Sequence, residues 1–129
     1  MTPDLKYLLF SVLLTFVQVL ITAAAANHVV GLTALAGNRE GLPEYKGFCG
    51  RAKRAHLNMI ENMVLFTALV LIAAVSGKAN ATTAMGALVF FWARLVYAVI
   101  FLLGIPWLRT VAWTVSVIGM VMIAVQIFP

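Results

Sequence analysis

The stretch RAKRAHLNMIENMVLF, residues 51–66, takes a dense polar motif directly into an apolar segment. An apolar run of roughly 20 residues crosses the hydrocarbon core of a bilayer as a helix. Such a run opens here with Glu61 already inside it. A charged side chain within a membrane span costs roughly 2.5–3.5 kcal/mol on insertion scales. Glu61 is therefore expected to face a partner or a wet cavity rather than lipid.

The rest of the chain has the composition of an integral membrane protein. Of its 129 residues, 64% are hydrophobic and 10% are charged, and the mean hydropathy is +1.04. Soluble domains are about 45–50% apolar and about 25% charged. Four apolar runs are long enough to span a bilayer, at about residues 5–30, 57–75, 81–103 and 107–128. The sequence predicts an all-α, up-down bundle of four membrane helices forming one domain, residues 1–129.

The first apolar run is expected to be a membrane span and not a cleaved signal. Its apolar stretch is longer than the usual core of a secretory signal, which has about 7–15 residues. Cys49 is the single cysteine, so no disulfide within the chain is expected. We also expect no metal site.

Basic residues gather between the first two predicted spans. They are Arg39, Lys46, Arg51, Lys53 and Arg54, whereas the opposite side carries only Lys6 and Lys78. The positive-inside rule then predicts that the loop of residues 31–55 is cytoplasmic and that both termini lie on the opposite side. We expect a bacterial inner membrane. Since topology explains the net charge of +5, this charge does not indicate a nucleic-acid partner.

The polar residues of the second span follow one face of a helix. At 3.6 residues per turn, five of them fall within an arc of about 100°. These five are Arg51, Arg54, Asn58, Glu61 and Asn62, and Lys53 and His56 lie outside the arc. Snorkelling explains basic residues at a helix end, but it does not explain Glu61. A purely structural ion pair is the alternative to a ligand site.

The third predicted span supplies a candidate partner. Arg94 lies in the middle of an apolar run, and Tyr97 follows it on the same face. Two spans that each carry a charge inside the membrane are expected to face one another. We predict that Glu61 and Arg94 are in contact and line a polar cavity in the cytoplasmic half. Arg109 follows Pro106 at the start of the fourth span, at the same end. A small zwitterionic ligand with carboxylates and an amine would suit these groups.

The motif RAHLNMIEN, residues 54–62, resembles the signature of the MAPEG family, the membrane-associated proteins in eicosanoid and glutathione metabolism. Within that family it looks closest to the microsomal glutathione transferase type. The resemblance continues through Arg94 and Tyr97 to PWLRTVAW, which opens the fourth span. It implies a homotrimer of four-helix subunits that binds glutathione between adjacent subunits at the cytosolic end. Membrane lipid and a lipophilic small-molecule substrate are the other implied partners.

The resemblance also implies roles for individual residues. Arg109 matches an arginine that stabilises the glutathione thiolate, and Thr110 takes the position of a serine hydroxyl. His56 matches a contact to glutathione on the neighbouring subunit, although a structural histidine at an interface is an equal alternative. The other implied glutathione contacts are Arg51, Arg54, Asn58, Glu61, Asn62, Arg94 and Tyr97.

Three departures from the family pattern concern the same region. Leu65 replaces a frequent proline, and Phe101 replaces a second tyrosine, which removes one hydroxyl from the site. Some members of the family carry an arginine near the end of the first span. This chain has no clear counterpart of it, and Arg39 is the nearest candidate. The implied cofactor site is therefore mostly retained but not complete.

These residues lead to one main hypothesis and two alternatives. Nearby cations lower the pKa of a thiol, and its thiolate is the nucleophile. We therefore expect a membrane-bound, glutathione-dependent transferase or peroxidase that acts on lipophilic electrophiles, with Arg109 stabilising the thiolate. A non-catalytic lipid- or glutathione-binding scaffold is the first alternative, which the loss of a hydroxyl at Phe101 would suit. A small proton-coupled transporter is the second, although the first span has no acidic residue.

Overall fold

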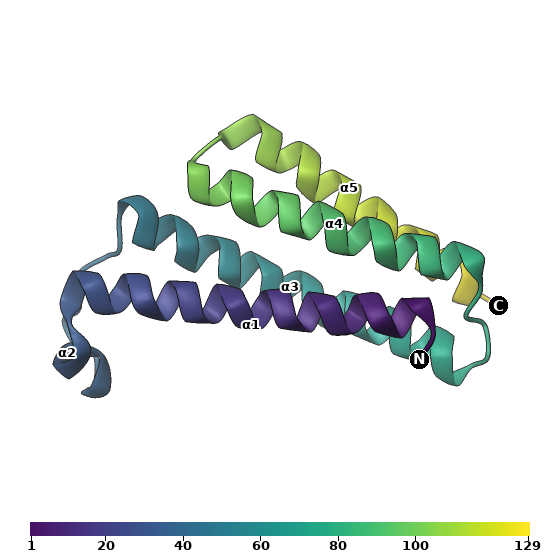
Figure 1. Cartoon of the computed structure of the whole chain (residues 1–129), viewed down its shortest axis with the longest axis horizontal. Helices are drawn as coiled ribbons and strands as arrows, with labels where there is room; N and C mark the ends of the chain where they lie inside the picture. Colours follow the sequence, from purple (N-terminus) through teal and green to yellow (C-terminus); the bar gives the residue numbers. More distant parts are fainter.

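The computed structural model describes all residues 1–129, and it contains helices but no strand. The helices are α1 (Pro3–Val30), α2 (Leu32–Ala36), α3 (Gly47–Val75), α4 (Ala81–Leu103) and α5 (Pro106–Ile127). The four long helices are apolar enough to cross a membrane. They lie side by side along the length of the molecule, with both termini at one end and α2 at the other (Figure 1). The predicted four-helix membrane bundle is confirmed.

The helix ends follow local sequence signals. The side chain of Asn80 accepts hydrogen bonds from the backbone amides of Thr82 and Thr83, at 2.8 and 3.1 Å, and this cap starts α4. Gly104 ends the same helix with a φ of 79°, a left-handed conformation that favours glycine. Pro106 opens α5 at its first turn.

The second long helix is longer than its apolar stretch. The apolar run begins near Leu57, whereas α3 already begins at Gly47. The basic motif therefore lies on the helix itself and continues the polar face that the sequence predicts. Residues between α2 and α3 form the irregular part of the connection.

The half of the bundle near the termini, called here the termini half, holds the larger apolar core. Phe66 of α3 and Phe90 of α4 stack with ring centroids 3.8 Å apart. Nearby, α4 and α5 approach closely at Gly86 and Gly119, where a Cβ atom on either residue would lie 2.6 Å from the carbonyl oxygen of the other. The core cluster comprises Leu8, Phe66, Val70, Ala73, Ala87, Phe90, Met120 and Ile123.

Polar contacts tie the helix ends together in this half. The buried carboxylate of Asp4 accepts a hydrogen bond from the hydroxyl of Thr83, which joins α1 to α4. The Nζ atom of Lys78 donates to the carbonyl oxygens of Ile127 and Phe128, at 3.0 and 3.3 Å. The side chains of Asp4, Thr83 and Lys78 therefore make structural contacts within the chain.

Candidate functional site

The opposite half of the bundle, called here the loop half, carries an open polar cavity between α3, α4 and the start of α5. Its main part has a volume of about 440 Å³, and an adjoining part has about 160 Å³. Asn58, Tyr97 and Arg109 line both parts. The main part adds Arg54, Leu57, Glu61 and Phe101, and the adjoining part adds Thr110 and Trp113. These nine residues are called the polar cavity below.

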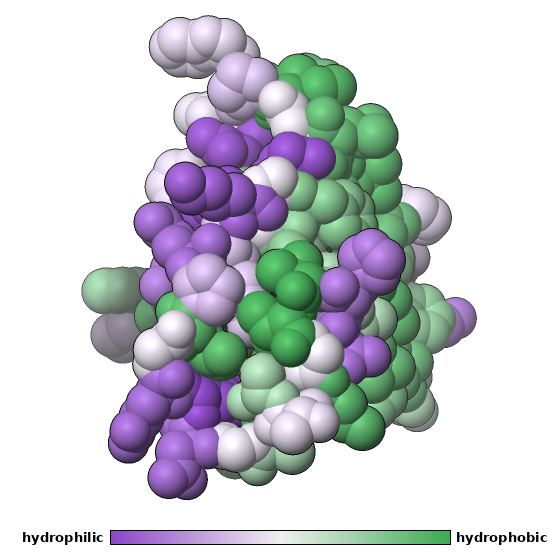
Figure 2. All heavy atoms as spheres, turned by 90° about the vertical axis from the view of Figure 1, so that its left-hand side faces the viewer, coloured by the Kyte–Doolittle hydropathy of each residue, from purple (hydrophilic) through white to green (hydrophobic).

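The surface of this end is strongly hydrophilic on one side. Figure 2 looks at the end that carries α2 and shows hydrophilic side chains gathered along one side, with hydrophobic surface beside them. Arg54 and Glu61 are exposed, and Arg109 is half-buried. The arginine side chains that donate hydrogen bonds within the chain are those of Arg39, Arg51 and Arg94. Arg54 and Arg109 therefore keep their hydrogen-bond donors for a ligand.

Two aromatic side chains pack next to Arg109, one against the other. Its guanidinium carbon lies 4.6 Å from the centroid of the Phe101 ring, which is a cation–π distance. Phe101 in turn packs edge-on against Tyr97, with ring centroids 5.6 Å apart. Phe101 places no hydroxyl here, and its ring packs against the arginine that follows in α5.

The predicted contact between Glu61 and Arg94 is wrong. Arg94 is completely buried, and its Nη2 atom donates to Oδ1 of Asn58 at 2.8 Å. Its Nε atom lies 3.4 Å from the sulfur of Met59. Glu61 lines the polar cavity instead, because a step of three residues from Asn58 turns it by about 60° around α3. Arg94 thus lies behind the cavity wall, and Glu61 lies at its rim.

Two other residues of the predicted polar face make structural contacts. The Nε atom of Arg51 donates to the carbonyl oxygen of Leu102 at 3.0 Å, in the last turn of α4. The Nδ2 atom of Asn62 donates to the carbonyl oxygen of Asn58 at 2.8 Å. Neither Arg51 nor Asn62 lines the polar cavity.

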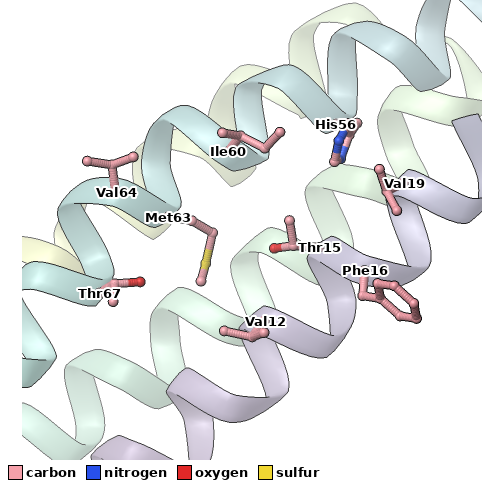
Figure 3. Close-up of a pocket in the computed structure, with 9 residues that line it drawn as sticks. All are labelled: Val12, Thr15, Phe16, Val19, His56, Ile60, Met63, Val64 and Thr67. Atoms are coloured by element: carbon pink, nitrogen blue, oxygen red, sulfur yellow. The ribbon is translucent and has the colours of Figure 1, made fainter.

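His56 lies apart from the polar cavity, as its position on α3 predicts. It borders an apolar groove of about 610 Å³ between α1 and α3. In Figure 3, His56 lies at one end of this groove and Thr67 at the other. The His56 side chain is 9% exposed, and its Nδ1 atom has no hydrogen-bond partner within the chain.

The polar cavity also contains an apolar residue that the polar pattern could not indicate. Leu57 neighbours Asn58 and lines the main part. Trp113 lies four residues after Arg109, a spacing that places both on one face of α5. This spacing is the sequence signal for Trp113, whereas Leu57 has none beyond its neighbour.

Comparison with known proteins gives one positive result. A family model described as the MAPEG family matches residues 5–128, nearly the whole chain. No curated protein and no solved structure matches the chain.

Proposed function

This chain belongs to the MAPEG family, and from that membership we propose that it is a membrane-bound, glutathione-dependent transferase or peroxidase acting on lipophilic electrophiles. One observation carries the proposal. The polar cavity holds Arg54 and Arg109 with their hydrogen-bond donors free, next to Glu61. Guanidinium groups with free donors beside an open cavity are available to bind an anionic ligand.

The groups of the polar cavity match the chemistry of the tripeptide. The planar fork of a guanidinium suits a carboxylate, so Arg54 is proposed to bind a glutathione carboxylate. Glu61 is proposed to bind the ammonium group. Asn58 and Tyr97 supply neutral polar groups between these charges. The volume of about 440 Å³ lies in the usual range of small-molecule sites, about 300–1,000 Å³.

Arg109 and Thr110 are proposed to activate the thiol. Both lie in the first turns of α5, which begins at Pro106, and the positive end of the helix dipole also favours an anion there. A guanidinium beside the sulfur stabilises the thiolate, and the Thr110 hydroxyl can donate a hydrogen bond to it. The thiolate then attacks an electrophilic carbon, forms the S–C bond and displaces the leaving group. Trp113 borders the same part of the cavity and offers apolar surface to the electrophile.

A homotrimer in a bacterial inner membrane, with glutathione bound between subunits at the cytoplasmic end, is part of this proposal. Its support is the open shape of the polar cavity, which a neighbouring copy would close. Arg51, Asn62 and Arg94 lie outside the cavity within one chain, and His56 faces the apolar groove. In the trimer, His56 is the residue proposed to reach the glutathione of a neighbour.

A scaffold without catalysis is the second candidate. Phe101 favours it, because this side chain places no hydroxyl in the polar cavity. Such a protein would bind glutathione or lipid but would not turn over an electrophile.

The decisive experiment compares binding with turnover on purified protein. We expect glutathione to bind in a calorimetric titration and to be conjugated to a chromogenic aryl halide. Arg109→Ala should lower kcat about a hundredfold and change the Kd for glutathione much less, since it removes stabilisation of the reacting sulfur. Lys53→Ala is the matched control, because Lys53 is exposed and does not line the polar cavity.

The possible results separate the candidates. Binding without turnover indicates the scaffold. An Arg109→Ala variant with an unchanged rate would defeat the assigned role of this arginine. Absence of glutathione binding would overturn the proposed function as a whole.

A further inference from the structure

Arg94 is the largest completely buried side chain of the molecule, and it carries a full charge in the middle of α4. Burial of a charge costs several kcal/mol unless good partners compensate it. Its partners here are neutral: the Asn58 oxygen, the Met59 sulfur and the face of the Tyr97 ring. The Nη1 atom has no partner within the chain. Bracing of the bundle would be served as well by an apolar residue, so the arginine calls for another explanation.

The contact with Asn58 determines the orientation of that amide. Oδ1 of Asn58 accepts from Nη2 of Arg94 at 2.8 Å and from Nδ2 of Asn62 at 3.4 Å. Arg94 has only donors, so the oxygen of the amide must face it. The Nδ2 atom of Asn58, with its two hydrogens, is consequently turned away from Arg94.

Asn58 lies where that orientation matters, because it lines both parts of the polar cavity. With its oxygen held from behind, the amide presents donors to the cavity. An amide turned the other way would present an acceptor and would repel a carboxylate or thiolate. The contact with Arg94 therefore determines whether the Asn58 amide attracts an anion or a hydrogen-bond donor of the ligand.

Tyr97 is held from the same side. The guanidinium carbon of Arg94 lies 4.2 Å from the centroid of the Tyr97 ring. Phe101, which packs against Tyr97, contacts Arg109 in turn, with the guanidinium carbon 4.6 Å from the centroid of the Phe101 ring. Arg94 thus contacts two residues of the cavity wall, Asn58 and Tyr97, but does not line the cavity itself.

We infer that Arg94 is a positioning residue, which orients the Asn58 amide from behind the cavity wall so that its N–H groups meet an anionic group of the ligand. Arg94 does not contact the ligand itself, in contrast to the glutathione contact that the family resemblance implies for it. The inference rests on the proposed function for the identity of the ligand, glutathione.

A double-mutant cycle on glutathione affinity tests the inference. Arg94→Met removes the donor and the charge but keeps an unbranched apolar side chain, a replacement that buried ionic sites often tolerate. We expect about tenfold weaker binding for Arg94→Met and about tenfold for Asn58→Ala. The double variant should also lose about tenfold, because Arg94 has nothing to orient once Asn58 is gone. Arg94→Lys keeps a donor and a charge and should remain within about threefold of the unaltered protein.

Thermal unfolding in detergent distinguishes a variant that loses affinity for glutathione from one that loses stability of the bundle. Ile123→Ala is the control, because Ile123 is fully buried in the core of the termini half. It should lower the melting temperature and leave the affinity for glutathione unchanged.

Two results would overturn the inference while leaving the proposed function intact. One is an unchanged affinity in Arg94→Met. The other is an additive loss of about a hundredfold in the double variant, which would show that Arg94 acts independently of Asn58. If the unaltered protein does not bind glutathione, the proposed function fails first and the inference fails with it.

Discussion

The two halves of this bundle treat polar groups in opposite ways. In the termini half, the Asp4 carboxylate has Thr83 as its donor, and the Lys78 ammonium holds two carbonyl oxygens of the last helix. In the loop half, polar side chains are left without partners although they are buried. The buried atoms without a hydrogen-bond partner belong to Gln18, Thr22, His56 and Arg94, and all four residues lie in the loop half.

The apolar packing differs in the same direction. The termini half has a core of eight buried residues and the close contact of Gly86 with Gly119. The loop half has a cluster of four, which consists of Ala55, Tyr97, Phe101 and Ala112. Each buried polar group without a partner costs about 1–3 kcal/mol. We conclude that the termini half supplies stability, which offsets the cost of the buried polar groups without partners in the loop half.

Of the changes that test this difference between the halves, a charge reversal in the polar cavity should have the largest effect, and it should act on glutathione affinity. Arg54→Glu places a carboxylate where an anionic ligand is expected, and we expect glutathione affinity to fall about a hundredfold. The melting temperature should hardly change, because Arg54 is exposed. Lys53→Glu is the matched control, since Lys53 is exposed on the same helix but does not line the cavity. Equal losses in both variants would mean that general surface charge, and not a site, attracts the ligand.

The converse change, in the termini half, should lower stability and spare binding. Gly119→Ala would place a Cβ atom 2.6 Å from the Gly86 oxygen and 2.9 Å from the Phe90 amide nitrogen. Overpacking of this kind costs about 1–3 kcal/mol, so thermal unfolding should occur at a clearly lower temperature. Gly37→Ala is the control, because its Cβ would meet nothing closer than 3.6 Å. Weaker glutathione binding by the folded Gly119→Ala protein would argue against a division of roles between the halves.

The smallest effect is expected for a buried amide of the loop half. Gln18 is 6% exposed, and neither atom of its amide has a partner within the chain. Gln18→Leu removes a desolvated polar group and keeps a similar volume, so the melting temperature should stay unchanged or rise, by the equivalent of up to about 1 kcal/mol. A marked fall would show instead that a water molecule or a neighbouring copy satisfies this amide.

Much of the fold could be predicted because membrane spans are a local property. Apolar runs of sufficient length, the cap at Asn80 and the proline at the start of α5 each act within a few residues. The site could be predicted in part. The 3.6-residue period brought Arg54, Asn58 and Glu61 onto one face, and these three do line the polar cavity.

The other residues of the predicted polar face show what helical periodicity cannot predict. Arg51 and Asn62 share the same arc, yet Arg51 donates to the end of α4 and Asn62 to its own helix. An arc of about 100° covers both the rim of a cavity and its buried back wall. Which of the two a residue joins depends on the neighbouring helix.

The sequence by itself determined that this chain is a bundle of four membrane helices of the MAPEG family with polar residues along one face of α3. Only the tertiary structure decided that Arg94 meets Asn58 and not Glu61. Helical period and hydropathy are properties of a single segment, whereas a contact between helices depends on their relative depth, rotation and crossing, which packing determines.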